Sequence, residues 1–275
     1  MTSSTIAIIG AGNMGSSLIG GLIQHGFESD NIIATDPSKE KLEHLVDTFQ
    51  VKTTTDNADA VKIADVVIFA IKPQLFAKVA VPLAKDIQHK KPLIISIAAG
   101  IRVDSIQTWL GGNVAIVRAM PNTPALIGCG ATAIFANHYV SSSQKKLAQS
   151  ILESVGIVVT IDDESQIDAV TALSGSGPAY FFLVMEAMQQ AAVEMGLSAD
   201  IAHQLTLQTS LGAARMAIEK HDSLQQLRKN VTSPGGTTEK ALFILEENNL
   251  RGIFKKALLA AKSRSEELAK LLGDH

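Results

Sequence analysis

The stretch IAIIGAGNMGSSLIGGLI near the N-terminus is the feature that most limits the folds available to this chain. It places Gly10, Gly12 and Gly15 in G-x-G-x-x-G spacing, directly after an apolar run and before a helical pattern. The first glycine allows a tight turn, the second lets the backbone approach a pyrophosphate, and the third lets the helix pack on the strand. We therefore predict a dinucleotide site whose diphosphate lies at the helix N-terminus, beside Asn13 and Met14. A glycine-rich turn without a ligand is the alternative.

The first 160 residues alternate short β-branched runs with helical patterns. Several of the runs are apolar nearly throughout, as strands covered on both faces must be. The helical pattern at 141–156 begins with serines suited to an N-cap and stops at Gly156. This alternation predicts an α/β fold with a Rossmann-type, doubly wound and mostly parallel sheet. The expected strands are residues 5–10, 31–36, 64–71, 92–98, 113–120, 130–137 and 156–161.

Strand patterns stop at about residue 164, and long helical patterns follow at 176–197, 198–220 and 250–273. The first of these helices is apolar around much of its circumference, so it must be covered on several sides. A subunit interface would provide that cover; a central position inside one bundle is the alternative. We expect a dinucleotide-binding domain at 1–163 and an all-helical dimerisation and substrate domain at 164–275.

Composition narrows the function classes. Hydrophobic residues make up 46% of the 275 residues and the formal net charge is −3, which favours a sizeable core over disorder. Few aromatics and no Lys/Arg run argue against a nucleic-acid partner. The single Cys129 excludes an internal disulfide framework, and the seven histidines show no metal-ligand spacing, so we expect no metal. We see no apolar stretch of membrane-spanning length and no signal peptide, and expect a soluble, cytoplasmic protein.

The second expected strand ends at Asp36, about twenty residues after Gly15. A carboxylate there would accept hydrogen bonds from the adenosine ribose and repel a 2′-phosphate, which favours NAD. Ser38 and Lys39, with Lys41 close behind, could hold that phosphate instead. Asp36 could equally be the N-cap of the next helix. The choice between NADH and NADPH therefore stays open.

A third candidate segment is DVVIFAIKPQ, residues 65–74. It runs from a buried strand into Lys72 and Pro73, and ligands in such sheets sit at the carboxyl ends of central strands. Pro73 fixes the backbone as it leaves the strand. Lys72 could line the cofactor groove near the nicotinamide, or be a solvated loop lysine. We take Ala70, Lys72 and Pro73 as candidate cofactor contacts.

Six motifs together resemble one family. GAGNMG, AIKPQ, SIAAGI, RAMPNTPA, ALSGSGPAYFF and TSPGGTT occur in the order and spacing of pyrroline-5-carboxylate reductase, over essentially the whole chain. The resemblance implies reduction of 1-pyrroline-5-carboxylate to L-proline by NADPH, the usual cofactor of the family, or by NADH. It also implies a Rossmann domain followed by a dimerisation domain, in homodimers that often assemble into decamers.

The resemblance gives TSPGGTT a chemical role. The substrate carboxylate needs hydrogen-bond donors, which Ser233 and the backbone N–H groups of Gly236, Thr237 and Thr238 could supply. The family pattern places the hydroxyl of Thr238 near the ring nitrogen, where it would orient or protonate the imine. For both threonines the alternative is helix capping alone. Asn230, Val231 and Gly235 border the same corner, with Asn230 on its cofactor side.

Three further segments are assigned by the same resemblance. Ala98 and Ala99 of SIAAGI, with Pro121 of RAMPNTPA, would lie along the nicotinamide side of the groove. The segment SGSGPAY at 174–180 would open the first interface helix beside nicotinamide and substrate. Asn57 would contact the adenosine, unless it is simply an N-cap.

Two other functions fit parts of the pattern. A 3-hydroxyacid dehydrogenase has a similar architecture, but its chemistry favours a lysine or similar group in the interdomain helix. Residues 175–195 contain no Lys, His or Arg. A non-catalytic NAD(P)-sensing protein would not need the hydroxyls between Ser233 and Thr238.

Overall fold

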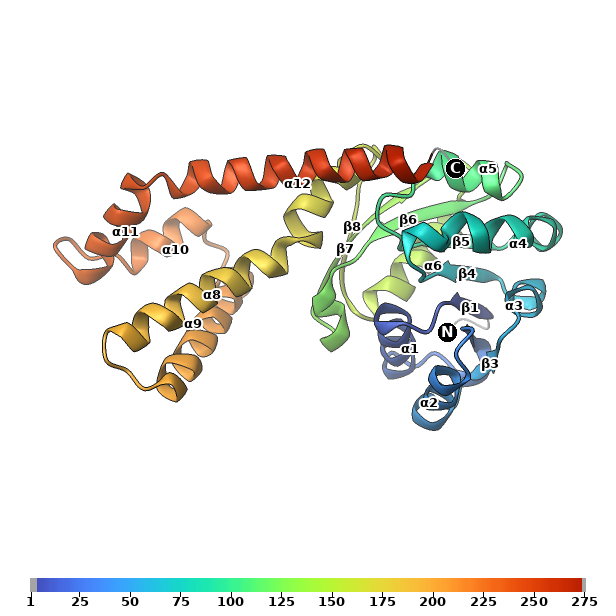
Figure 1. Cartoon of the computed structure of the whole chain (residues 1–275), viewed down its shortest axis with the longest axis horizontal. Helices are drawn as coiled ribbons and strands as arrows, with labels where there is room; N and C mark the ends of the chain where they lie inside the picture. Colours follow the sequence, from blue (N-terminus) through green and yellow to red (C-terminus); the bar gives the residue numbers. More distant parts are fainter. Residues whose placement is uncertain (1–3, 274–275) are drawn as a thin grey trace. The chain divides into compact units, whose positions relative to one another are not determined.

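The computed structural model describes residues 4–273, which form two compact units (Figure 1). The first unit comprises the chain up to Ser176 together with the chain from Ala260 onward. The second unit is Gly177–Leu259. The domain boundary expected between residues 163 and 164 stays a prediction.

Eight strands form one sheet in the order β3-β2-β1-β4-β5-β6-β7-β8. Neighbouring strands are parallel except β6 and β7, which are antiparallel. The order from β3 to β6 is that of a doubly wound dinucleotide-binding sheet, so the predicted Rossmann-type fold is confirmed. The strands are β1 (Ile6–Ile9), β2 (Ile32–Thr35), β3 (Lys52–Thr54), β4 (Val66–Phe69), β5 (Leu93–Ser96), β6 (Ile116–Met120), β7 (Gly130–Ala136) and β8 (Gly156–Thr160).

Strand β3 is missing from the sequence prediction, which has the other seven. It pairs with β2 at the edge of the sheet, with Lys52 opposite Ile33 and Thr54 opposite Thr35. Its three residues are polar and none is buried. A short polar edge strand carries no apolar pattern, so hydrophobic periodicity cannot reveal it.

Consecutive strand residues feed two separate apolar cores, one on each face of the sheet. Ile6 and Ile8 pack with side chains of α1, α2 and α6, whereas Ala7 and Ile9 pack with those of α3, α4 and α5. This two-sided burial explains why the strand sequences are apolar nearly throughout. The helices of this unit are α1 (Asn13–Gln24), α2 (Lys39–Phe49), α3 (Asn57–Ile63), α4 (Phe76–Lys90), α5 (Val103–Trp109), α6 (Ser142–Glu153) and α7 (Gln166–Val170), with the short 3₁₀ segments η1 (Ser29–Asn31), η2 (Pro73–Leu75) and η3 (Thr123–Ile127).

The helical region begins earlier than the sequence suggests. After α7 the chain forms the π-helical segment η4 (Thr171–Gly175) and then α8 (Gly177–Glu194). The expectation that SGSGPAY opens a helix agrees with the start of α8 at Gly177, but the sequence prediction missed that Ser174 and Gly175 already lie in the π-helical segment η4. The remaining helices are α9 (Ala199–Glu219), α10 (Leu224–Asn230), α11 (Thr237–Glu247) and α12 (Leu250–Gly273).

The helical stretch Gln166–Glu194 is long and apolar enough to cross a membrane by length and composition alone. The expectation that no segment has this property is therefore wrong. The apolar pattern at 176–197 predicts a separate helix, whereas the helical backbone begins ten residues earlier, at Gln166. The apolar helical stretch is therefore longer than that pattern indicates. The core helix of a soluble protein can pass the same test.

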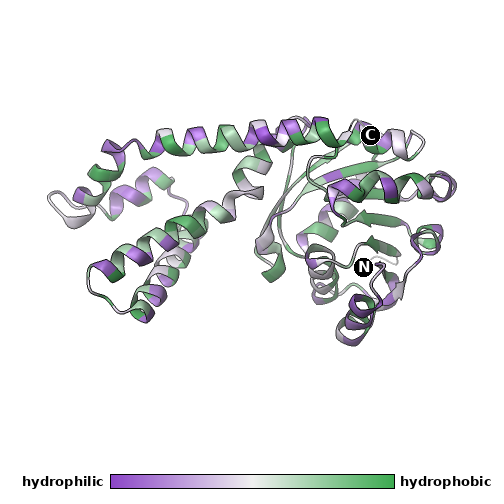
Figure 2. Cartoon of the chain, viewed as in Figure 1, coloured by the Kyte–Doolittle hydropathy of each residue, from purple (hydrophilic) through white to green (hydrophobic). Residues whose placement is uncertain are grey.

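The second unit has very little interior of its own. Among residues 177–259, only Gly177, Ala202 and Thr206 are buried. Large apolar side chains of α8 are mostly in water, with Phe181 68% exposed and Phe182 64% exposed. Figure 2 shows hydrophobic residues along α8 and α9. One copy of the chain thus leaves α8 uncovered, which favours the interface interpretation over a helix inside one bundle.

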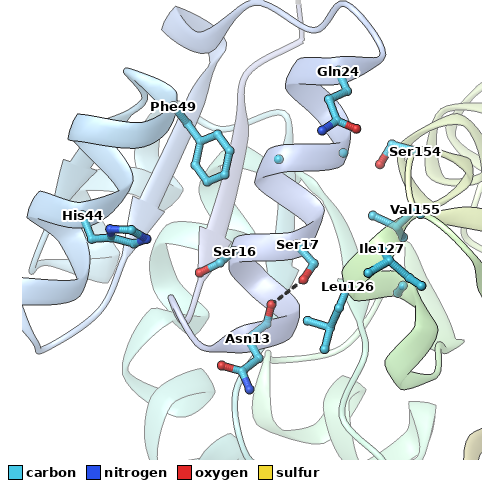
Figure 3. A pocket seen from close by; sticks show the side chains of 14 residues that line it. Asn13, Ser16, Ser17, Gln24, His44, Phe49, Leu126, Ile127, Ser154 and Val155 are labelled. Carbon is cyan, nitrogen blue, oxygen red and sulfur yellow. Dashed lines mark hydrogen bonds between the residues drawn. The ribbon is translucent and has the colours of Figure 1, made fainter. Parts of the chain in front are cut away.

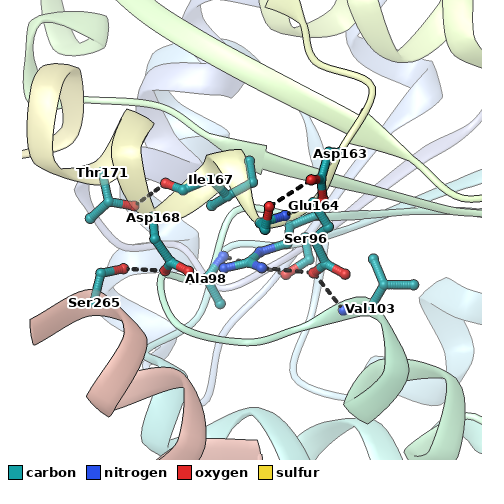
Figure 4. Close-up of polar contacts among 11 residues, drawn as sticks. Ser96, Ala98, Val103, Asp163, Glu164, Ile167, Asp168, Thr171 and Ser265 are labelled. Atoms are coloured by element: carbon teal, nitrogen blue, oxygen red, sulfur yellow. Dashed lines mark hydrogen bonds and ion pairs between the residues drawn. The ribbon is translucent and has the colours of Figure 1, made fainter. Parts of the chain in front are cut away.

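An ion pair between a buried arginine and a partly buried glutamate fixes the start of the helical region to the sheet. The Nη1 atom of Arg118 on β6 lies 2.7 Å from Oε1 of Glu164, and the Arg118 side chain is 3% exposed. The same carboxylate oxygen accepts a hydrogen bond from the backbone N–H of Val103, at 2.9 Å. Close by, the hydroxyl of Ser265 on α12 donates to Asp168 on α7 at 2.6 Å. Figure 4 shows Glu164 beside Val103 and Ser265 beside Asp168. The first contact joins the chain before α7 to the start of α5, and the second joins α7 to α12.

Replacing Glu164 by Gln should destabilise the first unit. The substitution keeps the side-chain shape but leaves the buried guanidinium of Arg118 without its counter-charge, which costs about 3 kcal/mol for buried pairs. We expect a lower midpoint of thermal unfolding, measured by circular dichroism. The control is Asp59→Asn, which removes the exposed pair with Lys62 and should change stability by less than ~1 kcal/mol. Equal unfolding midpoints for both variants would contradict a stabilising role for the Arg118–Glu164 ion pair.

Candidate active site

The three glycines after β1 have different structural roles. Gly10 has φ +108°, and a Cβ atom there would lie 2.5 Å from the carbonyl oxygen of Ala70. A Cβ at Gly15 would lie 2.1 Å from the oxygen of Gly10, so neither position tolerates a side chain. Gly12 faces open space, with no atom within 4 Å of a Cβ built there. Two glycines therefore bring α1 against the strands, and the third leaves room for a ligand.

The N-terminus of α1 fits an anion. Its N-cap is Gly12, which has no side chain to satisfy the first N–H groups of the helix. Asn13 and Met14 are the first two residues of the helix, and Asn13 is exposed. The open approach above Gly12 and the unsatisfied helix N–H groups have the form that a pyrophosphate requires. The residues present thus fit the predicted dinucleotide.

Asp36 connects the glycine turn to the end of β2. Its carboxylate accepts hydrogen bonds from the backbone N–H groups of Ala11, at 3.0 Å, and Ser38, at 2.9 Å. The Nζ atom of Lys41 lies 3.5 Å away. The N-cap alternative for Asp36 is wrong, because Ser38 is the N-cap of α2 and accepts from the N–H of Lys41. Lys39, the first residue of α2, is exposed.

Asn57 is positioned by the same strand. Its Oδ1 atom accepts a hydrogen bond from the hydroxyl of Thr35 at 2.6 Å. Asp56 is the N-cap of α3, so the N-cap alternative for Asn57 is also wrong. Asn57 lines a cavity of about 550 Å³ formed by residues of α3 and α4 and the loops before them.

The other predicted cofactor residues follow the carboxyl ends of neighbouring parallel strands. Ala70 follows β4, Ala98 follows β5 and Pro121 follows β6. The register aligns these ends, with Ile9 opposite Phe69 and Phe69 opposite Ser96. Ala98 and Pro121 are buried, whereas Lys72 and Ala99 are exposed and Pro73 begins η2. The predicted cofactor residues of the first unit therefore gather at the carboxyl ends of the parallel strands, where doubly wound folds bind ligands. We call this side of the sheet the dinucleotide edge.

A separate cavity of about 500 Å³ lies along the outer face of α1 (Figure 3). Ser16, Ser17 and Gln24 of α1 face it, with His44 and Phe49 of α2 opposite. Of the predicted cofactor residues, only Asn13 lines it. We assign this cavity no role in the predicted dinucleotide site.

The second unit contains the TSPGGTT corner. Residues Ser233 to Gly236 form a turn in which the N–H of Gly236 donates to the oxygen of Ser233 at 3.0 Å, and Gly235 has φ +70°. Helix α11 follows, with Thr237 and Thr238 as its first residues and Gly236 as its N-cap. Because no side chain caps this helix, the capping alternative for the two threonines is wrong. The side-chain Oε2 atom of Glu239 accepts a hydrogen bond from the backbone N–H of Gly235 at 2.8 Å.

Two candidate residues precede this turn. Asn230 ends α10, and its Oδ1 atom accepts a hydrogen bond from the side chain of Gln226 at 2.7 Å. Val231 follows as the C-cap and is 61% exposed. The structure thus brings Asn230, Val231 and the hydroxyl-rich turn together within the second unit. Within residues 4–273, no group of three or more His, Cys, Asp or Glu side chains could hold a metal.

Sequence reasoning missed the side chains that connect these segments. Asn122 bridges the N–H of Ala131 and the oxygen of Ser174, and Arg118 pairs with Glu164. The only available signal for Asn122 was its place between two prolines in MPNTP. An arginine inside an otherwise apolar strand was the available signal for Arg118, because a buried charge needs a partner.

Comparison with known proteins places these features in one family. Residues 164–268 match the family model described as pyrroline-5-carboxylate reductase dimerisation, and residues 5–100 match that described as NADP oxidoreductase coenzyme F420-dependent. The expectation that the helical region self-associates agrees with the first match.

Relatives match along the whole chain. The pyrroline-5-carboxylate reductase of Pseudomonas aeruginosa is 48% identical over 99% of this chain and 100% of its own length. The solved structure of the enzyme from Coxiella burnetii is also 48% identical, with a TM-score of 0.94 over 97% of this chain and 99% of that one. The Plasmodium falciparum pyrroline carboxylate reductase, solved with NADP bound, is 31% identical, with a TM-score of 0.86 over 98% of this chain and 99% of that one. The chain belongs to the pyrroline-5-carboxylate reductase family.

Proposed function

We propose that this protein reduces 1-pyrroline-5-carboxylate to L-proline with NADPH, the last step of proline biosynthesis. The observation that carries the proposal is a full-length relationship at 48% identity to a pyrroline-5-carboxylate reductase. The open approach above Gly12 and the hydroxyl-rich corner supply the two sites that this reaction needs. The 3-hydroxyacid dehydrogenase and the non-catalytic sensor have no comparable support.

The substrate dictates what the protein must do. It is a small cyclic imine that carries a carboxylate, and in its protonated form it readily accepts a hydride. When bound, the cofactor supplies that hydride from C4 of the nicotinamide to C5 of the imine. The protein therefore needs mainly to hold the carboxylate and fix the orientation of the ring. Neither covalent catalysis nor a metal is required.

We assign the carboxylate to the turn that precedes α11. The N–H groups of Thr237 and Thr238 lie in the first helical turn, where backbone donors lack partners within the helix and the dipole favours an anion. The hydroxyl of Ser233 lies beside Gly236, where it can add a donor. The hydroxyl of Thr238 is then the group that orients or protonates the ring nitrogen.

The surroundings of Asp36 favour NADPH. Both carboxylate oxygens already accept backbone N–H groups, and Lys41 lies 3.5 Å away. This arrangement occupies one acceptor site on each carboxylate oxygen, and Lys41 offsets the negative charge that would repel a 2′-phosphate. The exposed Lys39 and the neighbouring Ser38 then supply the phosphate contacts.

We also propose that the working unit is a homodimer in the cytoplasm. The uncovered apolar side chains of α8 and α9 are the surface that a second copy would cover. Each active site would join the dinucleotide edge of one subunit to the Ser233–Thr238 corner of its partner, and dimers would assemble further into decamers. Light scattering tests the assembly, and a stable, active monomer would exclude it.

Steady-state kinetics tests the proposed reaction directly. Purified protein should oxidise NADPH only when 1-pyrroline-5-carboxylate is present, with proline as the product. A 3-hydroxyacid as the sole substrate would support the dehydrogenase instead, and cofactor binding without turnover would support the sensor.

Gly12→Val should abolish dinucleotide binding without unfolding the protein. Its side chain would enter the open space that we assign to the pyrophosphate. Isothermal titration calorimetry with NADP⁺ should show no binding, at an unchanged melting temperature. The matched variant Gly15→Val should lower the melting temperature itself, because its Cβ would lie 2.1 Å from a backbone oxygen. If Gly12→Val still bound NADP⁺, the pyrophosphate site assigned to Gly12 would be wrong.

Lys39→Ala should weaken NADPH binding selectively. Loss of one charge-assisted contact to the 2′-phosphate should raise KM for NADPH roughly tenfold, with little change for NADH. Lys85→Ala, an exposed lysine of α4, is the control. Equal effects on both cofactors would remove Lys39 from phosphate recognition.

Thr238→Ala should lower kcat/KM for the imine by about 100-fold, the usual effect of losing one transition-state hydrogen bond. The affinity for NADPH, measured by fluorescence titration, should stay unchanged. Thr238→Ser keeps the hydroxyl and should retain most of the activity. Wild-type kinetics in the alanine variant would exclude Thr238 from the mechanism.

A further inference from the structure

We propose that Asn122 is a positioning residue for hydride transfer. Its side-chain amide joins the segment that follows β6 to the π-helical turn η4, and this junction sets the position of one wall of the cofactor groove. The inference rests on the proposed function, and adds to it a residue that contacts neither cofactor nor substrate in the assignments above.

The amide of Asn122 bridges two backbone groups. Its Oδ1 atom accepts from the N–H of Ala131 at 2.9 Å, and its Nδ2 atom donates to the carbonyl of Ser174 at 3.0 Å. A backbone N–H can only donate and a carbonyl can only accept, so the orientation of the amide is fixed. Asn122 occupies the N-cap position of η3 but makes no capping bond. Its amide is committed to the bridge.

The carbonyl of Ser174 is an acceptor that needs such a donor. In a regular α-helix its partner would be the N–H four residues later, but that residue is Pro178, which has none. The backbone here is already π-helical, with the N–H of Ser176 bonded to the oxygen of Thr171 at 2.8 Å. Single π-helical turns occur frequently at functional sites. Asn122 thus supplies from outside a donor that proline removes from the helix.

A second contact joins the same two segments. A Cβ atom on Gly175 would lie 2.6 Å from Cε of Met120, so the methionine side chain lies directly against this glycine. Met120 is the last residue of β6, and Asn122 follows two residues later. The hydrogen bond from Asn122 to Ser174 and the packing of Met120 against Gly175 therefore fix the carboxyl end of β6 to η4.

The junction between β6 and η4 lies near the predicted nicotinamide contacts. β6 is parallel to β5, and the register places Ser96 opposite Arg118, two residues before the end of β6. The junction therefore stands at the sheet edge where the predicted nicotinamide contacts Ala98 and Pro121 follow their strands. Hydride transfer is sensitive to displacement, since misplacement by about 1 Å can cost 100-fold in rate.

The test substitution is Asn122→Asp. It keeps the side-chain volume and the acceptor for Ala131, removes the donor, and places a carboxylate beside the carbonyl of Ser174. We expect kcat to fall by about 10- to 100-fold while KM for NADPH changes less than about threefold. The primary isotope effect with NADPH deuterated at the transferred C4 position should increase, because hydride transfer becomes more rate-limiting.

Asn137 provides a matched control at the opposite end of β6. Its Oδ1 atom accepts from the N–H of Ile116 at 3.1 Å, and its Nδ2 atom donates to the oxygen of Val114 at 2.9 Å. Asn137→Asp makes the same chemical change away from the groove. It should lower the melting temperature but leave kcat and the isotope effect as in the wild type.

The outcomes separate this inference from the proposed function. An inactive wild type contradicts the proposed function, and the inference with it. If the wild type is active, two results overturn the positioning role alone. The first is an unchanged kcat and isotope effect in Asn122→Asp, and the second is an equal loss of kcat in Asn137→Asp. If Asn122→Asp does not fold, Gly175→Ala carries the test, because its methyl group must displace Met120 from η4. It should lower kcat and raise the isotope effect in the same way, and wild-type values would overturn the proposal.

Discussion

The exposed apolar surface of the second unit is the constraint on which the functional protein depends. Helices α8 to α11 and the first part of α12 bury almost nothing within one chain, and side chains such as Phe181 and Leu183 lie about two-thirds in water. Transfer of such side chains out of water contributes about 1.5–3 kcal/mol each, so self-association has a large driving force. The same surface explains why Gln166–Glu194 has the composition of a membrane span. Within a dimerisation region, that composition serves contact between copies of the chain.

The first unit has the opposite property, because its two cores lie within the chain itself. Close approach of backbones at Gly10 and Gly15 leaves Gly12 as the open position. Asp36 then fixes the glycine turn to β2, and Asn122 fixes the end of β6 to η4. Polar contacts therefore flank the proposed cofactor site, a buried one at Asp36 and a partly buried one at Asn122. The proposed substrate corner, by contrast, lies in the second unit, whose apolar side chains are exposed in a single copy of the chain.

Much of this organisation follows from sequence patterns, and the failures have physical causes. Two-sided burial produced apolar runs that predicted seven strands and the Rossmann-type sheet, whereas the polar edge strand β3 left no pattern. Capping propensity suggested Asp36 and Asn57 as N-caps, but Ser38 and Asp56 hold those positions. The bridges made by Asn122 and Glu164 connect residues 52 and 46 positions apart in the chain. Contacts at such separations depend on the folded sheet, so local patterns cannot predict them.

The central claim is that one subunit's dinucleotide edge works with its partner's Ser233–Thr238 corner. Mixing and reassociating the Gly12→Val and Thr238→Ala proteins tests it most directly. In a mixed dimer, one active site would combine the intact edge of the Thr238→Ala subunit with the intact corner of the Gly12→Val subunit. Random reassociation should then restore about a quarter of the wild-type rate of imine-dependent NADPH oxidation, since half of the dimers are mixed and each has one intact site. A mixture no more active than the two separate variants would contradict the account.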